Sequence, residues 1–261
     1  MLTIKNNIIM KPIKFIRTIL LSAVALTSAV SLQSCLDDDD YNDYYLTMPN
    51  ALVTAKTSAD NTFYLQLDDS TTLLPVNISS SPFGEKELRA LVNYNEVDEA
   101  HANYSQAVHI NWIDSILTKD IAVDKGPEND TYYGNDPVEM IADWVTIAED
   151  GYLTLRFRTA WGNTGTNHFV NLLAINPDNP YEVEFRHNAF GDINGHQADA
   201  LVAFNLNKLP DTNGETVKLK LKWNSYSGEK TYEFDYCTRK STDGNTSEIA
   251  KSRTSHQVSV Y

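Results

Sequence analysis

The stretch "VKLKLKW", residues 217–223, alternates apolar side chains with lysines at every position. Successive side chains of a β-strand point to opposite faces, so Trp223 and the aliphatic residues in phase with it would line a buried face, while the lysines would face water. The stretch "YLTLRFRT", residues 152–159, repeats the pattern with threonine and arginine on the polar side. Both stretches predict strands of a sheet that has one solvated face.

Five further β-rich runs accompany these two in the C-terminal part of the chain. They are residues 141–148, 167–175, 181–187, 199–206 and 230–236. Seven short strands separated by turn residues are typical of an antiparallel β-sandwich. No run of useful length has a helical period, so we expect an all-β protein.

The N-terminal half holds shorter strands. Its β-rich runs are residues 51–56, 62–68, 72–77, 88–94 and 107–117. Five short strands so close together along the chain suit a small, partly closed barrel. In the last run Val108, Ile110 and Trp112 alternate with polar residues, which predicts that all three face the same side. The polar, turn-rich residues 118–137 then predict a connection between two domains.

A basic segment and the apolar run "ILLSAVALTSAVSL" precede Cys35. Basic residues, a short apolar run and small residues before a cleavage site predict a secretory signal peptide over residues 1–34. The run is too short for a membrane-spanning helix, which needs about 20 apolar residues. The sequence "LQSC" resembles the lipobox of bacterial lipoproteins, and this resemblance implies that Cys35 becomes the lipidated first residue of the mature chain.

Four aspartates follow this cysteine after one leucine: Asp37, Asp38, Asp39 and Asp40. Like charges repel one another and cannot be buried unpaired, so residues 35–45 should form a solvated tether. The run also resembles the acidic tag that directs Bacteroidetes-type lipoproteins to the outside of the outer membrane. We therefore expect an outer-membrane protein that is held by its lipid and faces the cell exterior.

Charge and cysteine content narrow the class of protein further. The chain has 35 acidic and 21 basic residues, a formal net charge of -14. A surface this acidic repels phosphate groups, so nucleic acid is not an expected partner. With Cys35 lipidated, Cys237 is the remaining cysteine, and no intramolecular disulfide is available. Pairing of Cys237 between two chains stays open.

Several segments resemble the NigD-like lipoproteins, in the order of that family. They are "FYLQLDDSTTLLPVN", "RALVNYNEVDE", "VHINWIDSI", "YGNDPVEMIADWVTIAEDGYLTLRFRTAWG", "NPYEVEFRHNAFGD", "LVAFNLNKLPDT" and "VKLKLKWNSYSGEKTYEFDYC". The resemblance spans residues 46–239 and implies an N-terminal OB-type barrel and a C-terminal immunoglobulin-like β-sandwich. It supplies no catalytic or binding residues.

The resemblance and the strand pattern together predict the domain boundaries. We expect the OB-like domain over residues 46–119, a linker over 120–136 and the β-sandwich over 137–239. The polar composition of residues 240–261 predicts a disordered tail.

Motifs for catalysis or metal binding are missing from the sequence. The histidines are not spaced along the chain as in a zinc-binding motif. This applies to His101, His109, His168, His187 and His196. The stretch "GDINGHQAD", residues 191–199, is faintly like a calcium loop but lacks the terminal ligand, which favours a hydrated hairpin loop. There is no G-x-S-x-G nucleophile motif and no phosphate-binding loop. The sequence predicts no catalytic residue, no metal site and no cofactor.

Among the tryptophans, Trp144 is the candidate contact residue. Trp112, Trp161 and Trp223 are each in phase with apolar neighbours, so we expect them in or beside a core. Trp144 lies instead on the face opposite Val145 and its apolar companions. The sequence leaves its role open between an interdomain contact and an exposed patch.

Two classes of function fit these observations. The first is a non-catalytic surface lipoprotein that binds a glycan, a peptide or an envelope partner, and the missing catalytic motifs favour it. The second is a surface hydrolase directed at glycans, which would use a pair of buried carboxylates across the domain interface. A bacteriocin-associated accessory or immunity role rests on the family name alone.

Overall fold

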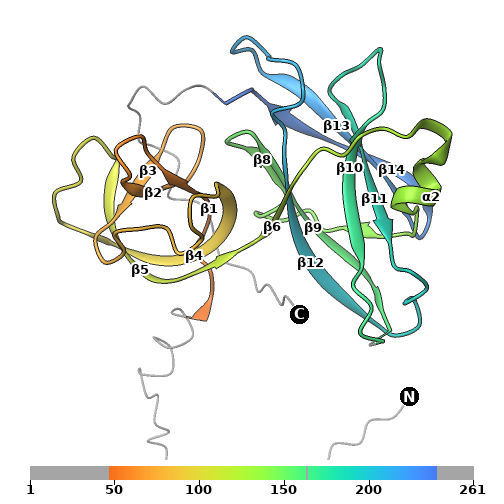
Figure 1. Cartoon of the computed structure of the whole chain (residues 1–261), viewed down its shortest axis with the longest axis horizontal. Coiled ribbons are helices and arrows are strands. Elements are labelled where there is room, and N and C mark those ends of the chain that lie inside the picture. The colour runs from red at the N-terminus through yellow and green to blue at the C-terminus, as the bar shows by residue number, and fades with distance from the viewer. Residues whose placement is uncertain (1–46, 163, 240–261) are drawn as a thin grey trace, which may run out of the picture. The chain divides into compact units, whose positions relative to one another are not determined.

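The computed structural model describes residues 47–162 and 164–239. The predicted lipid site at Cys35, the predicted tag at residues 37–40 and the predicted tail at residues 240–261 lie outside them. The described residues form an all-β fold, as the sequence predicts, with a closed barrel followed by two sheets (Figure 1). No helix among them is both long and apolar enough to cross a membrane.

The five N-terminal strands close into a barrel in the order β1-β2-β3-β5-β4. They are β1 (Ala51–Thr57), β2 (Phe63–Gln66), β3 (Thr72–Pro75), β4 (Leu88–Val97) and β5 (Gln106–Ser115). Neighbouring strands are antiparallel except for the parallel pair β3–β5. Apolar residues on the inner faces fill the barrel, among them Val53, Leu65 and Val92. The five predicted strands and the small OB-like barrel are therefore confirmed.

A β-bulge in β5 changes the position of Trp112. In the pairing with β4, Ile110 and Trp112 lie opposite consecutive residues, so Asn111 is an extra residue without a partner. A bulge shifts the alternation of side chains by one position. Ile110 is buried in the barrel core, whereas Trp112 packs against a different apolar cluster. The prediction that Trp112 shares a face with Ile110 is wrong.

Two sheets form the C-terminal sandwich. One contains, in spatial order, β10 (Phe169–Ala174), β11 (Glu182–Asn188), β13 (Val217–Ser225) and β14 (Gly228–Tyr236). The other contains β6 (Leu117–Asp120), β12 (His196–Asn205), β9 (Tyr152–Trp161) and β7 (Glu139–Met140), and β8 (Ile147–Glu149) pairs with β9. Most neighbours are antiparallel, as predicted. The pairs β11–β13 and β6–β12 are parallel because the chain visits the other sheet between them.

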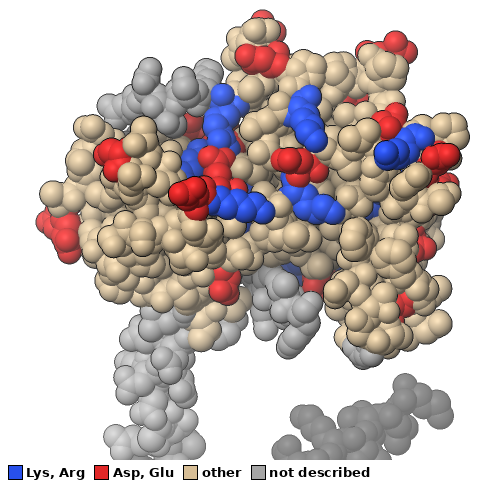
Figure 2. Space-filling view, in the orientation of Figure 1, with Lys and Arg blue, Asp and Glu red and all other residues tan. Residues whose placement is uncertain are grey.

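The stretch at residues 217–223 occupies β13 as its pattern predicts. Trp223 and the leucines in phase with it are buried in a core that both sheets share. The lysines lie on the outer face, where they form the ion pairs Lys218–Asp235, Lys220–Glu182 and Lys222–Glu229. Figure 2 shows basic side chains interspersed with acidic ones on the face in view. The row of lysines is thus partly neutralised by its neighbours.

Residues 141–148 do not form the single strand that their apolar content predicts. A turn separates β7 from β8. The hydroxyl of Thr146 donates to the carbonyl of Ile141 at 2.6 Å, and the carboxylate of Asp143 accepts from the N–H of Val145 at 3.2 Å. Hydrogen bonds between side chains and backbone compete with strand pairing, and here they replace it.

The connection predicted as a linker over residues 120–136 contains regular structure. It holds η1 (Gly126–Glu128) and α2 (Asn129–Tyr133), and α2 lies against β10 and β11 (Figure 1). Asp130 on α2 forms an ion pair with Arg186 on β11. The strand before the connection, β6, pairs with β12 and so belongs to the sandwich, although most of it was expected in the barrel domain.

Candidate functional site

An apolar cluster joins the barrel to the sandwich. Its buried members are Leu52, Leu91 and Ile116 from the barrel and Val145, Leu201 and Ala203 from the sandwich. Trp144 is half-buried and packs against this cluster, as does Trp112. The turn that interrupts the predicted strand at residues 141–148 places Trp144 there. Removing apolar area from water, at about 25 cal/mol per Å², holds the two domains together.

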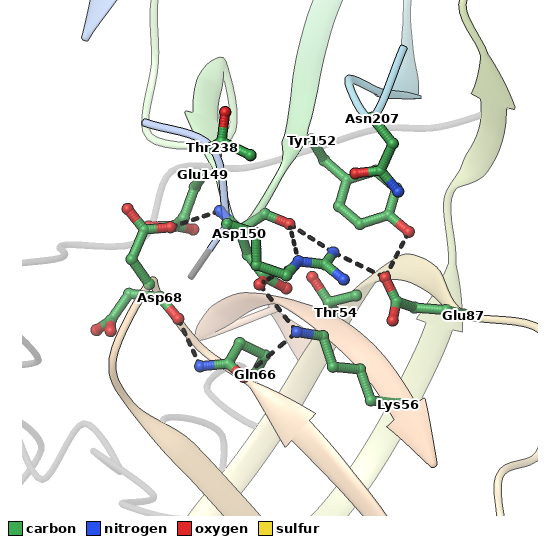
Figure 3. A network of polar contacts seen from close by, with 12 residues as sticks. Thr54, Lys56, Gln66, Asp68, Glu87, Glu149, Asp150, Tyr152, Asn207 and Thr238 are labelled. Carbon is green, nitrogen blue, oxygen red and sulfur yellow. Dashed lines mark hydrogen bonds and ion pairs between the residues drawn. The ribbon is translucent and has the colours of Figure 1, made fainter. Parts of the chain in front are cut away.

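A network of buried charged side chains crosses the same interface (Figure 3). The tight turn between β8 and β9 supplies two adjacent carboxylates, Glu149 and Asp150. Asp150 has a φ of 49° and the next residue, Gly151, a φ of 74°. The barrel supplies two cations, Lys56 from β1 and Arg89 from β4, and Arg239, which follows β14, supplies a third. One hairpin of the sandwich therefore meets two strands of the barrel through opposite charges.

Asp150 is held between two cations. Its Oδ1 atom lies 2.9 Å from Nζ of Lys56 and 2.9 Å from Nε of Arg239. Lys56 also donates to the side-chain carbonyl of Gln66 at 3.3 Å. Burial lowers the pKa of Lys56, and the neighbouring Asp150 carboxylate opposes that shift. The ammonium group of Lys56 thus donates hydrogen bonds to two side chains, those of Asp150 and Gln66.

Arg89 is the most deeply buried member, with an exposed fraction of 0%. Its Nη2 atom lies 3.2 Å from Oε2 of Glu149, and its Nη1 atom donates to the hydroxyl of Thr54 at 3.0 Å. Burial lowers the pKa of Arg89, and Glu149 opposes the shift. A buried cation with one principal counter-ion is costly to leave unpaired.

Glu87 forms the third ion pair that the described residues make across the interface. Its Oε1 atom lies 2.7 Å from Nη2 of Arg239 and accepts a hydrogen bond from the hydroxyl of Tyr152 at 2.8 Å. Burial works to raise the pKa of Glu87, but Arg239 and Tyr152 outweigh it and lower that pKa. Burial, together with Glu87, raises the pKa of Tyr152. Both groups are therefore stabilised in their ordinary protonation states.

This geometry decides what the interface can do chemically. Glu149 and Asp150 are two buried carboxylates at the domain interface, which is the feature that a glycan hydrolase of the predicted kind would need. Each of them, however, contacts a cation of the barrel. General acid–base catalysis needs a group that can exchange its proton with a substrate. The network suits a clamp that fixes the orientation of the two domains.

A second polar cluster lies inside the sandwich. His168 Nδ1 is 2.9 Å from His187 Nε2, and His168 Nε2 is 3.3 Å from Asp192 Oδ2. Trp161, expected beside the core, stacks on His168 with ring centroids 3.9 Å apart. Burial, reinforced by His168, lowers the pKa of His187 to about 4. The spacing of these residues along the chain gave no signal, because they meet only where β9, β10 and β11 come together.

The structure uses the acids of residues 191–199 for contacts within the protein. Asp192 contacts His168, and Asp199 forms ion pairs with Arg156 and Arg158. Among residues 47–162 and 164–239, no group of three His, Cys, Asp or Glu side chains is arranged to hold a metal ion.

Both domains match known family models. Residues 52–116 match the NigD-like N-terminal OB domain, and residues 120–236 match the NigD-like C-terminal beta sandwich domain. A solved structure from Parabacteroides distasonis, described as toxin related, is 38% identical with a TM-score of 0.61, and the match covers 72% of this chain and 92% of that one.

Two more solved structures share the fold at lower identity. One is a protein of unknown function from Bacteroides vulgatus, 23% identical with a TM-score of 0.59, matched over 71% of this chain and 89% of that one. The other is a NigD-like immunity protein from Bacteroides caccae, 20% identical with a TM-score of 0.53, matched over 72% and 96%. No curated protein matches the chain.

Proposed function

Because this chain belongs to the NigD-like family, we propose that it is a non-catalytic surface lipoprotein that binds an envelope, peptide or glycan partner. The observation that carries the proposal is the interdomain network. Its carboxylates and cations contact one another at distances between 2.7 and 3.2 Å. Groups engaged in this way hold two domains in a fixed orientation, which suits the presentation of a binding surface.

We place the anchor at Cys35 and the folded domains on the outer side of the outer membrane. The signal segment, the cysteine and the four aspartates support this placement. Several acyl chains on one cysteine hold a soluble domain stably, at about 0.8 kcal/mol per buried methylene. A solvated tether over residues 35–45 reaches at most about 40 Å when extended, which is enough to carry the barrel clear of the lipid headgroups.

Membrane fractionation tests the anchor. Cys35→Ala should move the protein out of the membrane fraction or stall its processing, whereas Cys237→Ala, the matched control, should leave it there. Complete partition of the Cys35→Ala protein into detergent would contradict the assignment.

Turnover tests the non-catalytic role. The purified chain from Leu36 to Tyr261 should release no product from a broad panel of glycans and peptides. Hydrolysis that Glu149→Gln or Asp150→Asn abolishes would instead support the surface hydrolase.

A role in toxin immunity is a second candidate. It is favoured by the description of the 38% identical relative as toxin related and by the name of the Bacteroides caccae structure. Such a role predicts that deleting the gene makes the cell sensitive to a toxin from its own strain. Unchanged survival against culture supernatants of the parent strain would count against it.

A further inference from the structure

A cavity of about 240 Å³ opens between the edges of the two sheets of the sandwich. β14 is the outer strand of one sheet and β7 the outer strand of the other, and the turn after β7 faces β14 across the opening. The apolar lining consists of Met140, Ala142, Leu221, Trp223, Tyr232 and Phe234. This opening is not used by the interdomain network.

The lining is aromatic, with few polar groups left to serve a ligand. Tyr232 is 49% exposed and packs edge-on against Phe234, with ring centroids 4.9 Å apart. Two polar side chains also line the cavity, but both are engaged. Asp143 forms an ion pair with Arg156 at 2.8 Å, and Thr146 donates to a backbone carbonyl.

One donor in the lining lacks an acceptor. Trp223 is 6% exposed, and its indole N–H is buried without a hydrogen-bond partner among the described residues. An unpaired buried donor costs about 1–3 kcal/mol. Because water does not reach this nitrogen, a ligand in the cavity contacts the apolar surface of the wall and not the N–H.

The edge of β14 supplies a second element of recognition. Within the described residues this nine-residue strand pairs with β13 alone, which leaves its other edge without a strand. Unpaired N–H and C=O groups along such an edge are a template for another strand. On the outer face of β14 lie Glu229, Glu233 and Asp235. Glu229 and Asp235 already pair with Lys222 and Lys218 of β13, so among the described acids of this strand it is Glu233 that favours a basic partner.

The size and polarity of the cavity select between a sugar and a peptide. Sites for whole small molecules measure about 300–1,000 Å³, so this cavity holds one ring or one side chain. A sugar ring carries many hydroxyl groups, and a lining whose Asp143 and Thr146 are engaged, with the hydroxyl of Tyr232 as its accessible polar group, cannot satisfy them. An apolar side chain on a strand that pairs with β14 fits both the lining and the free edge.

We propose that β14 binds an extended, basic polypeptide segment by strand addition, with one aromatic or aliphatic side chain seated in the cavity. This inference rests on the binding role proposed above and names the class of its partner. Alternate residues of the segment would enter the space between the sheets, and the residues between them would face the acidic side chains of β14.

A peptide array tests the proposal. Nine-residue peptides with lysine and threonine at alternate positions would carry each apolar residue in turn at the centre, and binding to the chain from Leu36 to Tyr261 would be measured. Peptides with a central aromatic or large aliphatic residue should bind. They should also shift the indole ¹⁵N–¹H signal of Trp223. N-methylation at alternate backbone positions should abolish binding.

The matched variants are Ala142→Leu, which fills the cavity, and Ala174→Leu, which enlarges an exposed alanine on β10 instead. Ala142→Leu should weaken peptide binding about tenfold or more, and Ala174→Leu should leave it unchanged. If no peptide binds the unaltered chain, or if the best peptide binds the Ala142→Leu chain equally well, the proposal is wrong.

Glycans provide the competing outcome. Oligosaccharides that shift the Trp223 signal while peptides do not would overturn the strand-addition proposal. That result would leave the non-catalytic surface role intact, because the latter fails only on release from the membrane or on turnover.

Discussion

Replacing Glu149 by glutamine should lower the free energy of unfolding by about 3 kcal/mol. Glu149 is the principal counter-ion of Arg89, whose side chain is fully buried and whose Nη2 atom lies 3.2 Å from the carboxylate. At that distance and an effective dielectric constant near 20, the attraction between unit charges is about 5 kcal/mol. Glutamine keeps a hydrogen-bond acceptor, and Asp150 also attracts Arg89, so part of this attraction is retained.

Urea unfolding of the chain from Leu36 to Tyr261, followed by tryptophan fluorescence at pH 7, measures this loss. Glu229→Gln is the matched control, because Glu229 is exposed and pairs with Lys222 at 3.4 Å on the surface. Exposed pairs contribute roughly 0–1 kcal/mol, so the control should change little. The double variant Arg89→Met with Glu149→Leu should recover most of the loss, since it removes both charges together.

Equal midpoints for Glu149→Gln and Glu229→Gln would refute the reasoning. They would mean that Arg89 finds water or another anion when Glu149 is neutral, and that the interface is looser than a clamp. A double variant as unstable as Glu149→Gln alone would also contradict it, because the cost would then come from packing and not from an unpaired charge.

Further predictions concern the histidine cluster, the apolar interface and the export tag. His187 has a pKa of about 4 when folded against about 6.5 when unfolded. The unfolded state therefore binds more protons between these values, and stability should decrease as the pH is lowered from about 6.5 to about 4, by up to about 3 kcal/mol. His187→Gln should flatten that slope in unfolding experiments at pH 4 to 7, and an unchanged slope would assign it to other groups. Trp144→Ala should lower the free energy of unfolding by about 2 kcal/mol, because it opens the apolar cluster between the domains, and a loss below about 0.5 kcal/mol in urea would show that the indole contributes little. Replacing the four aspartates at residues 37–40 by alanine should give a protein that is still lipidated but is protected from protease added to intact cells. If the protease digests the altered and unaltered proteins equally, these aspartates act as a spacer and not as an export tag.

The alternation of apolar and polar residues correctly predicted the face on which a side chain lies wherever a strand pairs with its neighbour in regular register. Trp223 is buried and its lysine neighbours face outward, as the stretch at residues 217–223 predicts. The same reasoning failed at Trp112, because a bulge at Asn111 exists only in the pairing with β4. It failed again at residues 141–148, where hydrogen bonds from side chains to the backbone turn an apolar segment away from the sheet.

The polar clusters could not be found from the chain alone. Lys56 and Asp150 are 94 positions apart, and Arg89 and Glu149 are 60 apart. A lysine on a strand has the same local pattern whether it faces water or a buried carboxylate. The pair His168 and His187 likewise belongs to no metal-binding spacing, although their ring nitrogens lie 2.9 Å apart.

The sequence by itself determined the all-β class, the order of a barrel followed by a sandwich, and the outward face of the lysines, because neighbours along a strand decide which way each side chain points. Only the tertiary structure decided which charges are buried together, where Trp144 packs and which sheet edges enclose a cavity. Those features depend on how strands distant in the chain are brought side by side, and a buried charge can persist only where that arrangement supplies its partner.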